Sequence, residues 1–261
     1  MQKAIMQKET MPKYTMRKET MPRISSPVYF IGAGPGDPEL ITVKGKRLIE
    51  DADLIIYAGS LVNPQLLKGL RAELVDSSAL SLEQTTKLVL QAMAERKKVV
   101  RLHSGDPSLY GAILEQMKPL EEAGVDVEVI PGVSSLFAAA SALKTQLTLK
   151  GVSESLIITR PAGTTLEKDD LANLSRFGYT MAIFLATDKI RDVVKSIDLP
   201  AETPVAVVFH ASWPDQKVLI GDLADIADKV EDAKIDRSAL ILVGGVVART
   251  GFRRSHLYRD R

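Results

Sequence analysis

A glycine-rich run, Gly32–Pro38, directly follows the apolar segment Val28–Ile31. A glycine-rich turn between a strand and a helix is typical of loops that bind phosphate groups. This run matches neither common phosphate pattern. No Lys-Ser/Thr pair follows Gly36, and the third glycine comes one residue too early for G-x-G-x-x-G. The pattern leaves open which small molecule the loop contacts.

Asp37 argues further against a bound pyrophosphate, because a carboxylate at a helix N-terminus repels one. We interpret Asp37 as the helix N-cap and Pro38 as the first helical residue, since both residue types are common at those positions. The backbone of Gly34–Gly36 is then available to line a cleft. An NAD site stays open as an alternative, because Asp51 or Asp53 lies at the spacing of a ribose-binding carboxylate.

Two more loops of the same kind follow apolar segments. His103–Gly111 contains a second Gly-Asp-Pro, in which Asp106 either caps a helix or offers a carboxylate to a cationic or hydroxylated ligand. Pro131–Ser135 contains Ser134, which can cap the next helix, and either serine hydroxyl of this loop can face a ligand. Because open α/β sheets bind ligands at the carboxyl ends of their strands, we expect all three loops at such ends.

The segments around these loops alternate between strand-like and helix-like patterns up to about residue 147. Such alternation predicts a mainly parallel sheet covered by helices. The expected strands are Val28–Ile31, Asp53–Tyr57, Val99–Leu102 and Val125–Ile130. The expected helices are Pro38–Asp51, Leu82–Arg96, Leu109–Ala123 and the alanine-rich Ser134–Leu143.

A second α/β unit is expected from residue 149 onward. Its predicted strands are Leu156–Arg160, Met181–Ala186, Val205–His210, Val218–Ile220 and Leu240–Gly244. The short spacing between the third and fourth of these predicts an antiparallel hairpin, which makes the second sheet mixed. We therefore expect a two-lobed α/β protein, with an N-terminal lobe over residues 27–148, a C-terminal lobe over residues 149–250, and a ligand in the cleft between them.

Two tails are expected outside the lobes, a disordered one over residues 1–26 and a short one over residues 251–261. The N-terminal tail contains an imperfect repeat, residues 6–15 followed by 16–25, with a methionine at every fifth position. This spacing places the methionines on no single helix face, and Pro12 and Pro22 interrupt any helix. Six basic residues against two acidic ones in residues 1–25 make this tail weakly basic.

The composition excludes several classes of function. The chain has 261 residues, a formal net charge of +1 and no cysteine. A near-neutral body argues against nonspecific nucleic-acid binding, and the absence of cysteine excludes disulfides, thiolate catalysis and cysteine-based metal sites. No spacing of His, Asp and Glu indicates another metal site. There is no apolar run of roughly 20 residues and no apolar signal-peptide core, so we expect a cytoplasmic protein that does not span a membrane.

Taken together, these features resemble the tetrapyrrole methylase family, whose members use S-adenosylmethionine. The resemblance covers nearly all of Val28–Val247. Its motifs, in chain order, are Gly32–Pro38, Gly105–Pro107 with Tyr110–Gly111, Pro131–Ser135 and Trp213–Gln216.

One branch of that family, the precorrin-4 C(11)-methyltransferases of cobalamin synthesis, is the most similar. The features that carry this resemblance are Tyr57–Val62, His103, Tyr110–Ile113 and His210–Pro214. The uroporphyrinogen-III methyltransferases more typically have a second glycine at the position of Ser104.

The resemblance implies a homodimer of two-lobed subunits. S-adenosylmethionine would lie folded between the lobes, and a tetrapyrrole polycarboxylate would occupy an open trough above it. The implied cofactor contacts are Pro35, Ser104, Gly105, Asp106, Leu109, Tyr110, Ser134, Ser135, Leu185, Ala211 and Gly244. The implied reaction passes a methyl group from sulfur to a ring carbon, which needs alignment more than acid–base groups. No residue is assigned as a catalytic base.

Basic side chains near the trough are expected to hold the substrate's carboxylates, which arginine binds in bidentate fashion. The candidates are Lys44, Lys46, Arg101, Arg160, Arg249, Arg253 and Arg254. We interpret His103 and His210 as structural histidines, with a polar ligand contact as the alternative. We interpret Trp213 as a core or dimer-packing residue, with stacking on the substrate as the alternative.

Three alternative functions stay open. Within the same chemistry, the methyl group could go to another tetrapyrrole carbon, such as the uroporphyrinogen-III positions. From other classes, the protein could be a nicotinamide-dependent oxidoreductase or a non-catalytic nucleotide sensor. Binding of S-adenosylhomocysteine rather than NAD(H) separates the methyltransferase hypothesis from these last two.

Overall fold

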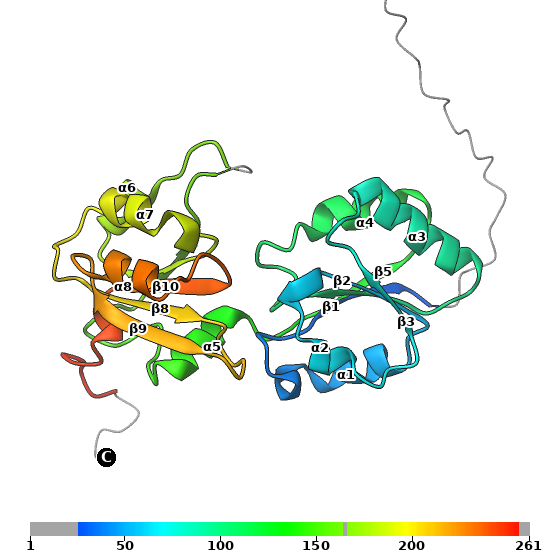
Figure 1. The fold of residues 1–261 in the computed structure, drawn as a ribbon, viewed down its shortest axis with the longest axis horizontal. Helices are drawn as coiled ribbons and strands as arrows, with labels where there is room; N and C mark the ends of the chain where they lie inside the picture. Colours follow the sequence, from blue (N-terminus) through cyan, green and yellow to red (C-terminus); the bar gives the residue numbers. More distant parts are fainter. Residues whose placement is uncertain (1–25, 164–165, 256–261) are drawn as a thin grey trace, which may run out of the picture.

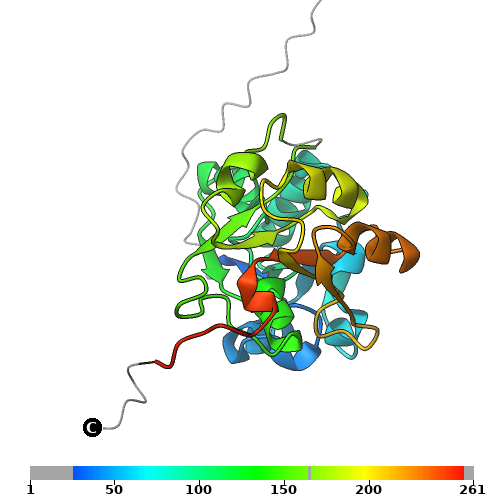
Figure 2. The same ribbon diagram turned by 90° about the vertical axis from the view of Figure 1, so that its left-hand side faces the viewer.

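The protein folds into two α/β lobes that lie side by side (Figure 1). The computed structural model describes residues 26–163 and 166–255. Figure 2, viewed along the long axis, shows the C-terminal lobe in front of the N-terminal lobe. The expected tail over residues 1–26 lies almost wholly outside the described residues, as does most of the tail over 251–261.

The sheet of the N-terminal lobe has five strands, all parallel, in the order β3-β2-β4-β1-β5. This confirms the expected parallel sheet. The strands are β1 (Val28–Gly32), β2 (Leu54–Tyr57), β3 (Glu73–Asp76), β4 (Val99–His103) and β5 (Val127–Ile130).

Helices cover both faces of this sheet, with α1 and α2 on one face and α3 and α4 on the other (Figure 1). Side-chain caps begin three of them: Thr42 accepts from the N–H of Gly45 at α1, Asn63 accepts from the N–H of Gln65 at α2, and Ser81 forms a capping box with Gln84 at α3. The helical elements are η1 (Pro38–Leu40), α1 (Val43–Glu50), η2 (Gly59–Leu61), α2 (Pro64–Leu67), α3 (Leu82–Ala94) and α4 (Ile113–Glu122).

The sheet of the C-terminal lobe is mixed, which confirms the expectation from the sequence. Its strand order is β6-β7-β10-β8-β9. β6 and β7 are parallel, whereas β10 runs antiparallel to both β7 and β8. β8 and β9 form the expected antiparallel hairpin. The strands are β6 (Leu156–Thr159), β7 (Thr180–Ile183), β8 (Pro204–Phe209), β9 (Lys217–Asp222) and β10 (Ala239–Val243).

Four helices flank this second sheet. The first of them, α5, was expected to complete the N-terminal lobe, but its Leu136 and Ala139 pack in one cluster with Ala206 and Leu242 of the second sheet. The other three lie on the opposite face. The helical elements are α5 (Ser135–Ala142), α6 (Leu171–Ser175), η3 (Thr187–Lys189), α7 (Ile190–Ser196), α8 (Ile226–Asp232) and η4 (Gly245–Val247).

Local structure departs from the sequence-based expectations at three places. The helix expected over 38–51 is divided into η1 and α1, because Thr42 adopts an extended conformation and caps a new helix. The helix expected from Leu109 begins only at Ile113, since Tyr110 and Ala112 both have left-handed backbone angles. The edge strand β3 was not expected, because its side chains are mostly exposed and show little apolar character.

None of the helices in residues 26–163 and 166–255 is long and apolar enough to cross a membrane. In the same residues, no group of three or more His, Cys, Asp or Glu side chains is placed to hold a metal ion.

Candidate active site

The three loops identified from the sequence meet at one edge of the first sheet. β4, β1 and β5 are neighbours in that sheet, so the loops that follow them leave it side by side. Backbone hydrogen bonds join the first two loops, from Gly34 N to Gly105 O (3.2 Å) and from Gly105 N to Gly34 O (2.8 Å). The order of the strands therefore assembles one site from segments that are far apart in the chain.

Asp106 connects the second loop to the third. One carboxylate oxygen accepts hydrogen bonds from the N–H (2.8 Å) and the hydroxyl (2.5 Å) of Ser108. The other accepts from the N–H of Gly132 at 2.9 Å. Burial favours the neutral acid, but the hydrogen bonds from Ser108 and Gly132 outweigh it and lower the pKa of Asp106. The carboxylate is thus ionised, and its hydrogen bonds hold the second and third loops together.

The first loop uses its backbone donors within the protein. Its first two N–H groups donate to carbonyl oxygens of the second loop. The N–H of Asp37 donates to Ser212 Oγ at 2.9 Å, and the Asp37 carboxylate accepts from the N–H of Glu39 at 2.9 Å, which confirms Asp37 as an N-cap. Pro38 has no N–H to offer. The N–H groups of Ala33, Gly34 and Asp37 are therefore not free to bind a pyrophosphate.

Trp213 joins the two lobes at the same loop. Its indole N–H donates to Pro35 O at 2.9 Å. A side chain at Gly36 would collide with the Trp213 ring, so this position requires glycine. Asn63 supports the loop from the other side by donating to Gly36 O at 2.8 Å. Trp213 therefore packs between the lobes of one chain, as well as lining the cleft between them.

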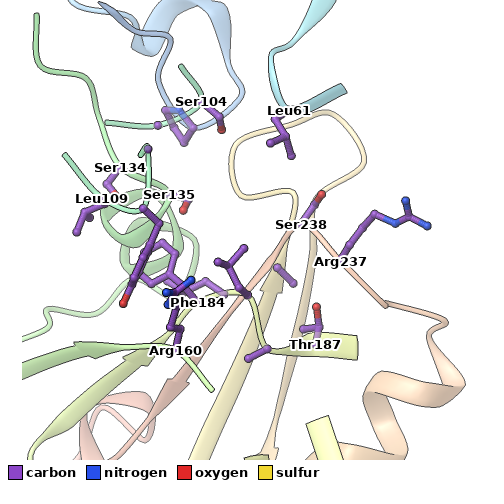
Figure 3. Close-up of a pocket in the computed structure, with 18 of the residues that line it drawn as sticks. Leu61, Ser104, Leu109, Ser134, Ser135, Arg160, Phe184, Thr187, Arg237 and Ser238 are labelled. Carbon is purple, nitrogen blue, oxygen red and sulfur yellow. The ribbon is translucent and has the colours of Figure 1, made fainter. Parts of the chain in front are cut away.

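A cleft of about 850 Å³ lies between the lobes (Figure 3). Figure 3 shows Ser104, Ser134 and Ser135 gathered on one side, with Thr187 and Arg237 toward the other. Ten of the eleven predicted cofactor residues line the cleft: Pro35, Ser104, Gly105, Asp106, Leu109, Tyr110, Ser134, Ser135, Leu185 and Ala211. These ten residues, predicted from separate segments of the sequence, therefore line one cleft in the structure.

Gly244, the eleventh predicted residue, lies outside the cleft lining. It follows the C-terminal end of β10, and its N–H donates to Pro204 O at the start of β8. Because β10 runs antiparallel to β7 and β8, the end of β10 that reaches the cleft is its N-terminal one. There Ala239 and Leu240 line the cleft instead, and a cofactor contact at Gly244 stays a prediction.

Several other lining residues were missed from the sequence. They come from the loop after β2, from α4, from the segments after β6 and β7, and from the turn before β10. They include Ala58, Ser60, Leu61, Gln116, Phe184, Thr187, Lys189, Arg237 and Ser238. Their position at strand ends could have indicated them as lining residues. It could do so only if the order and direction of the strands were known.

Of the seven basic candidates, only Arg101 and Arg160 line the cleft. Arg160 lies over the ring of Tyr110, with its guanidinium carbon 5.5 Å from the ring centroid. Burial raises the pKa of Tyr110, and the charge of Arg160 partly offsets this. The candidates outside the cleft lining are Lys44, Lys46, Arg249, Arg253 and Arg254.

Four lining residues other than glycine hold left-handed backbone angles. The φ angles are 55° at Tyr110, 52° at Leu185, 46° at His210 and 55° at Ser238. Such conformations tend to cluster at ligand sites, where the surrounding structure maintains them. At His210 the support is visible: Nδ1 lies 3.0 Å from the Asp215 carboxylate, and the ring stacks on Trp213 at 4.9 Å.

His103 is a buried neutral imidazole at the end of β4. Its ring stacks on Phe30 at 5.8 Å, and Nε2 is enclosed without a hydrogen-bond partner in the described part of the chain. Burial, with a smaller contribution from the charge of Arg101, lowers the pKa of His103 to about 3. The ring is therefore uncharged in the folded protein at any pH near neutrality.

This burial predicts a pH-dependent loss of stability. Below the ordinary histidine pKa of about 6.5, this histidine binds a proton in the unfolded chain, whereas His103 stays neutral in the folded protein. The free energy of unfolding therefore decreases as the pH is lowered to about 3. Between about pH 7.5 and pH 5 the expected loss is about 2 kcal/mol. Urea unfolding at both pH values, for the wild type and for His103→Phe, measures it. Between these pH values, the free energy of unfolding of His103→Phe should decrease less than that of the wild type, and the difference should be about the same 2 kcal/mol. Equal decreases in both proteins would contradict the buried neutral ring.

Comparison with known proteins agrees with this site. The sequence profile of the tetrapyrrole (corrin/porphyrin) methylases matches residues 27–227. A cobalt-precorrin-4 C(11)-methyltransferase from Methanocaldococcus jannaschii is 53% identical over 238 residues, which are 88% of this chain and 92% of the relative. A precorrin-4 C(11)-methyltransferase from Pseudomonas aeruginosa is 50% identical over 238 residues, 89% of this chain and 95% of the relative.

Solved structures give the same result. The X-ray structure of a cobalt-precorrin-4 methyltransferase of cobalamin biosynthesis has a TM-score of 0.83 and 41% identity, covering 87% of this chain and 99% of that one. A uroporphyrin-III C-methyltransferase from Thermus thermophilus, complexed with S-adenosylhomocysteine, has a TM-score of 0.73 and 27% identity, covering 90% and 96% of the two chains. With two lobes, one interlobe cleft and a profile match over most of its length, this chain belongs to the tetrapyrrole methylase family.

Proposed function

We propose that this protein is an S-adenosylmethionine-dependent C-methyltransferase of cobalamin biosynthesis that methylates ring position 11 of precorrin-4 or cobalt-precorrin-4. The observation that carries the proposal is the similarity to relatives with these names, at 53% and 50% identity over more than nine tenths of their length. One relative's name includes cobalt and the other's does not, so the proposal covers both forms of the substrate.

The residues of the cleft fit S-adenosylmethionine better than NAD. Three N–H groups of the first loop, those of Ala33, Gly34 and Asp37, are bonded within the protein, which suits a cofactor without phosphate groups. The serines of the second and third loops offer hydroxyls to its adenosine and amino-acid groups. Leu109, Leu185 and Leu240 add apolar surface for the adenine ring and the methionine chain. A structural neighbour complexed with S-adenosylhomocysteine supports the same choice.

When bound, S-adenosylmethionine supplies a methyl group on a sulfonium, which an electron-rich ring carbon displaces in line. The contribution of the protein is alignment, which can supply up to about 7–11 kcal/mol in favourable cases. Asp106 holds the second and third loops together, and Trp213 holds the first loop against the C-terminal lobe. These contacts fix the walls of the cleft before the ligands arrive.

The substrate is a tetrapyrrole polycarboxylate, and we place it in the part of the cleft that carries the basic side chains. Arg101 comes from the N-terminal lobe, and Arg160 and Lys189 from the C-terminal lobe. Arg237 also lines the cleft, but its charge is paired with Asp236 at 3.1 Å. Cations on both walls match a substrate with carboxylates around its rim.

Calorimetric titration of the purified protein with S-adenosylhomocysteine and with NADH tests the cofactor. We expect saturable binding of S-adenosylhomocysteine and no binding of NADH. NADH binding without S-adenosylhomocysteine binding would refute the proposal in favour of an oxidoreductase. Binding of neither would also refute it.

Two further properties belong to the same proposal. The family resemblance implies a homodimer. Sedimentation equilibrium would test it, and a monomer at micromolar concentration would contradict it. The cytoplasmic location expected from the sequence is tested by cell fractionation.

A further inference from the structure

Arg101 stands within an otherwise apolar strand. It is the third residue of β4, with Val99, Val100 and Leu102 around it, all of them buried. Because side chains alternate along a strand, Arg101 and His103 lie on the same face as Val99, the face covered by α3 and α4. A cation at such a position is costly unless a specific partner compensates it.

The partners that Arg101 has in the protein are neutral. Its Nε–H donates to the side-chain oxygen of Gln116 on α4 at 2.8 Å, and a terminal N–H donates to the carbonyl oxygen of Ile56 on β2 at 3.2 Å. Burial lowers the pKa of Arg101 to about 10, and no acidic neighbour among the described residues counteracts it. The side chain is still protonated at neutral pH, so it brings an uncompensated positive charge to the cleft wall.

The two neutral contacts fix the orientation of the guanidinium. Gln116 is itself held, because its amide nitrogen donates to Gly111 O at 3.1 Å and Ala112 O at 3.2 Å. An arginine has five N–H donors, and these contacts use two of the five. Three N–H donors of the Arg101 guanidinium therefore remain for a ligand, and the orientation of this planar group is fixed. Arg101 and Gln116 both line the cleft.

We propose that Arg101, oriented by Gln116 and Ile56, is the anchor for one carboxylate side chain of the tetrapyrrole substrate. A carboxylate accepts two parallel N–H bonds from a guanidinium, so this anchor sets the rotation of the macrocycle as well as its affinity. The subsite is bounded by the loop after β2, from which Ala58, Ser60 and Leu61 line the same cleft. This inference rests on the proposed function, because it names the group that recognises the substrate's acidic rim.

The test compares Arg101→Gln and Arg101→Lys with the wild type in two assays. Steady-state methylation of precorrin-4 gives KM and kcat, and calorimetry gives the affinity for S-adenosylhomocysteine. We expect Arg101→Gln to raise the tetrapyrrole KM about 10–100-fold, the size of a lost charge-assisted pair, with unchanged S-adenosylhomocysteine affinity. Arg101→Lys keeps the charge but not the planar fork, so its KM should lie between the two.

Arg71→Gln is the matched control, because Arg71 is exposed and outside the cleft lining. Its KM should equal that of the wild type. An unchanged KM in folded Arg101→Gln, or a parallel loss of S-adenosylhomocysteine affinity, would overturn the anchor and leave the proposed function standing. If Arg101→Gln does not fold, Arg101→Lys decides in the same way. Absence of any methylation by the wild type would instead refute the proposed function, and the anchor with it.

Discussion

Replacing Gly132 by alanine is expected to abolish measurable binding of S-adenosylhomocysteine and to destabilise the protein. A side chain at Gly132 would overlap the carbonyl oxygen of Gly105 and would approach Gly32 Cα to 2.7 Å. Both neighbours are backbone atoms of the adjoining loops, so they cannot rotate away as a side chain can. The three loops would have to separate. Overpacking of this kind typically costs about 1–3 kcal/mol, and here the strain falls on the backbone of Gly105, which lines the cleft.

Calorimetry with S-adenosylhomocysteine, together with thermal unfolding, measures both effects. Gly124→Ala is the control, because Gly124 lies in the turn after α4 with no atom within 4 Å of the added side chain. Its positive φ of 80° makes alanine strained by about 1 kcal/mol, so stability should fall while affinity stays unchanged. Wild-type affinity in Gly132→Ala would show that the close packing of the three loops does not shape the cofactor site.

Asp106→Ala is expected to weaken S-adenosylhomocysteine binding about 10–100-fold, the size of lost charge-assisted hydrogen bonds. The variant loses the bonds to Ser108 and to Gly132 N–H, so the second and third loops are no longer tied to each other. The cost in stability should stay nearer the roughly 1 kcal/mol of a lost cap. Calorimetry and urea unfolding on the same samples compare the two costs.

Ser108→Ala provides the matched comparison for Asp106→Ala. It removes only the hydroxyl contact and leaves the bond from Asp106 to Gly132, so its affinity should be close to that of the wild type. Near-normal affinity in a folded Asp106→Ala variant would reduce this carboxylate to a local turn cap. A similar loss in Ser108→Ala would show that the turn, and not the bond between the loops, determines binding.

Much of the fold could be predicted because its elements carry local signals. Apolar runs such as Val28–Ile31 and Val205–His210 gave strands, and the short connection after the latter gave the hairpin. β3 was missed because an exposed edge strand lacks an apolar run. The packing of α5 could not be predicted either, because an alanine-rich helix between two sheets can cover either one, and only tertiary contacts decide.

The same division applies to the site. A loop with Gly, Asp and Pro after a strand can be recognised from the local sequence. The role of Asp37 as an N-cap could likewise be predicted from its residue type and position. The position of Gly244 outside the cleft lining could not be foreseen, because the direction of β10 is a long-range property, set by pairing with β7 and β8. The neutral surroundings of Arg101 were equally hidden, since Gln116 reaches it from another element. Arg101 itself was already a candidate from the sequence for holding a substrate carboxylate.

The most direct test of the central claim is the position of the transferred methyl group. The protein is incubated with precorrin-4, in parallel with cobalt-precorrin-4 and uroporphyrinogen III, and with S-adenosylmethionine labelled with ¹³C in its methyl group. NMR of the products then locates the label. We predict that one labelled methyl group appears on ring carbon 11 of precorrin-4 or its cobalt form, with no label on uroporphyrinogen III. Label on any other ring carbon, or on uroporphyrinogen III alone, would contradict the account.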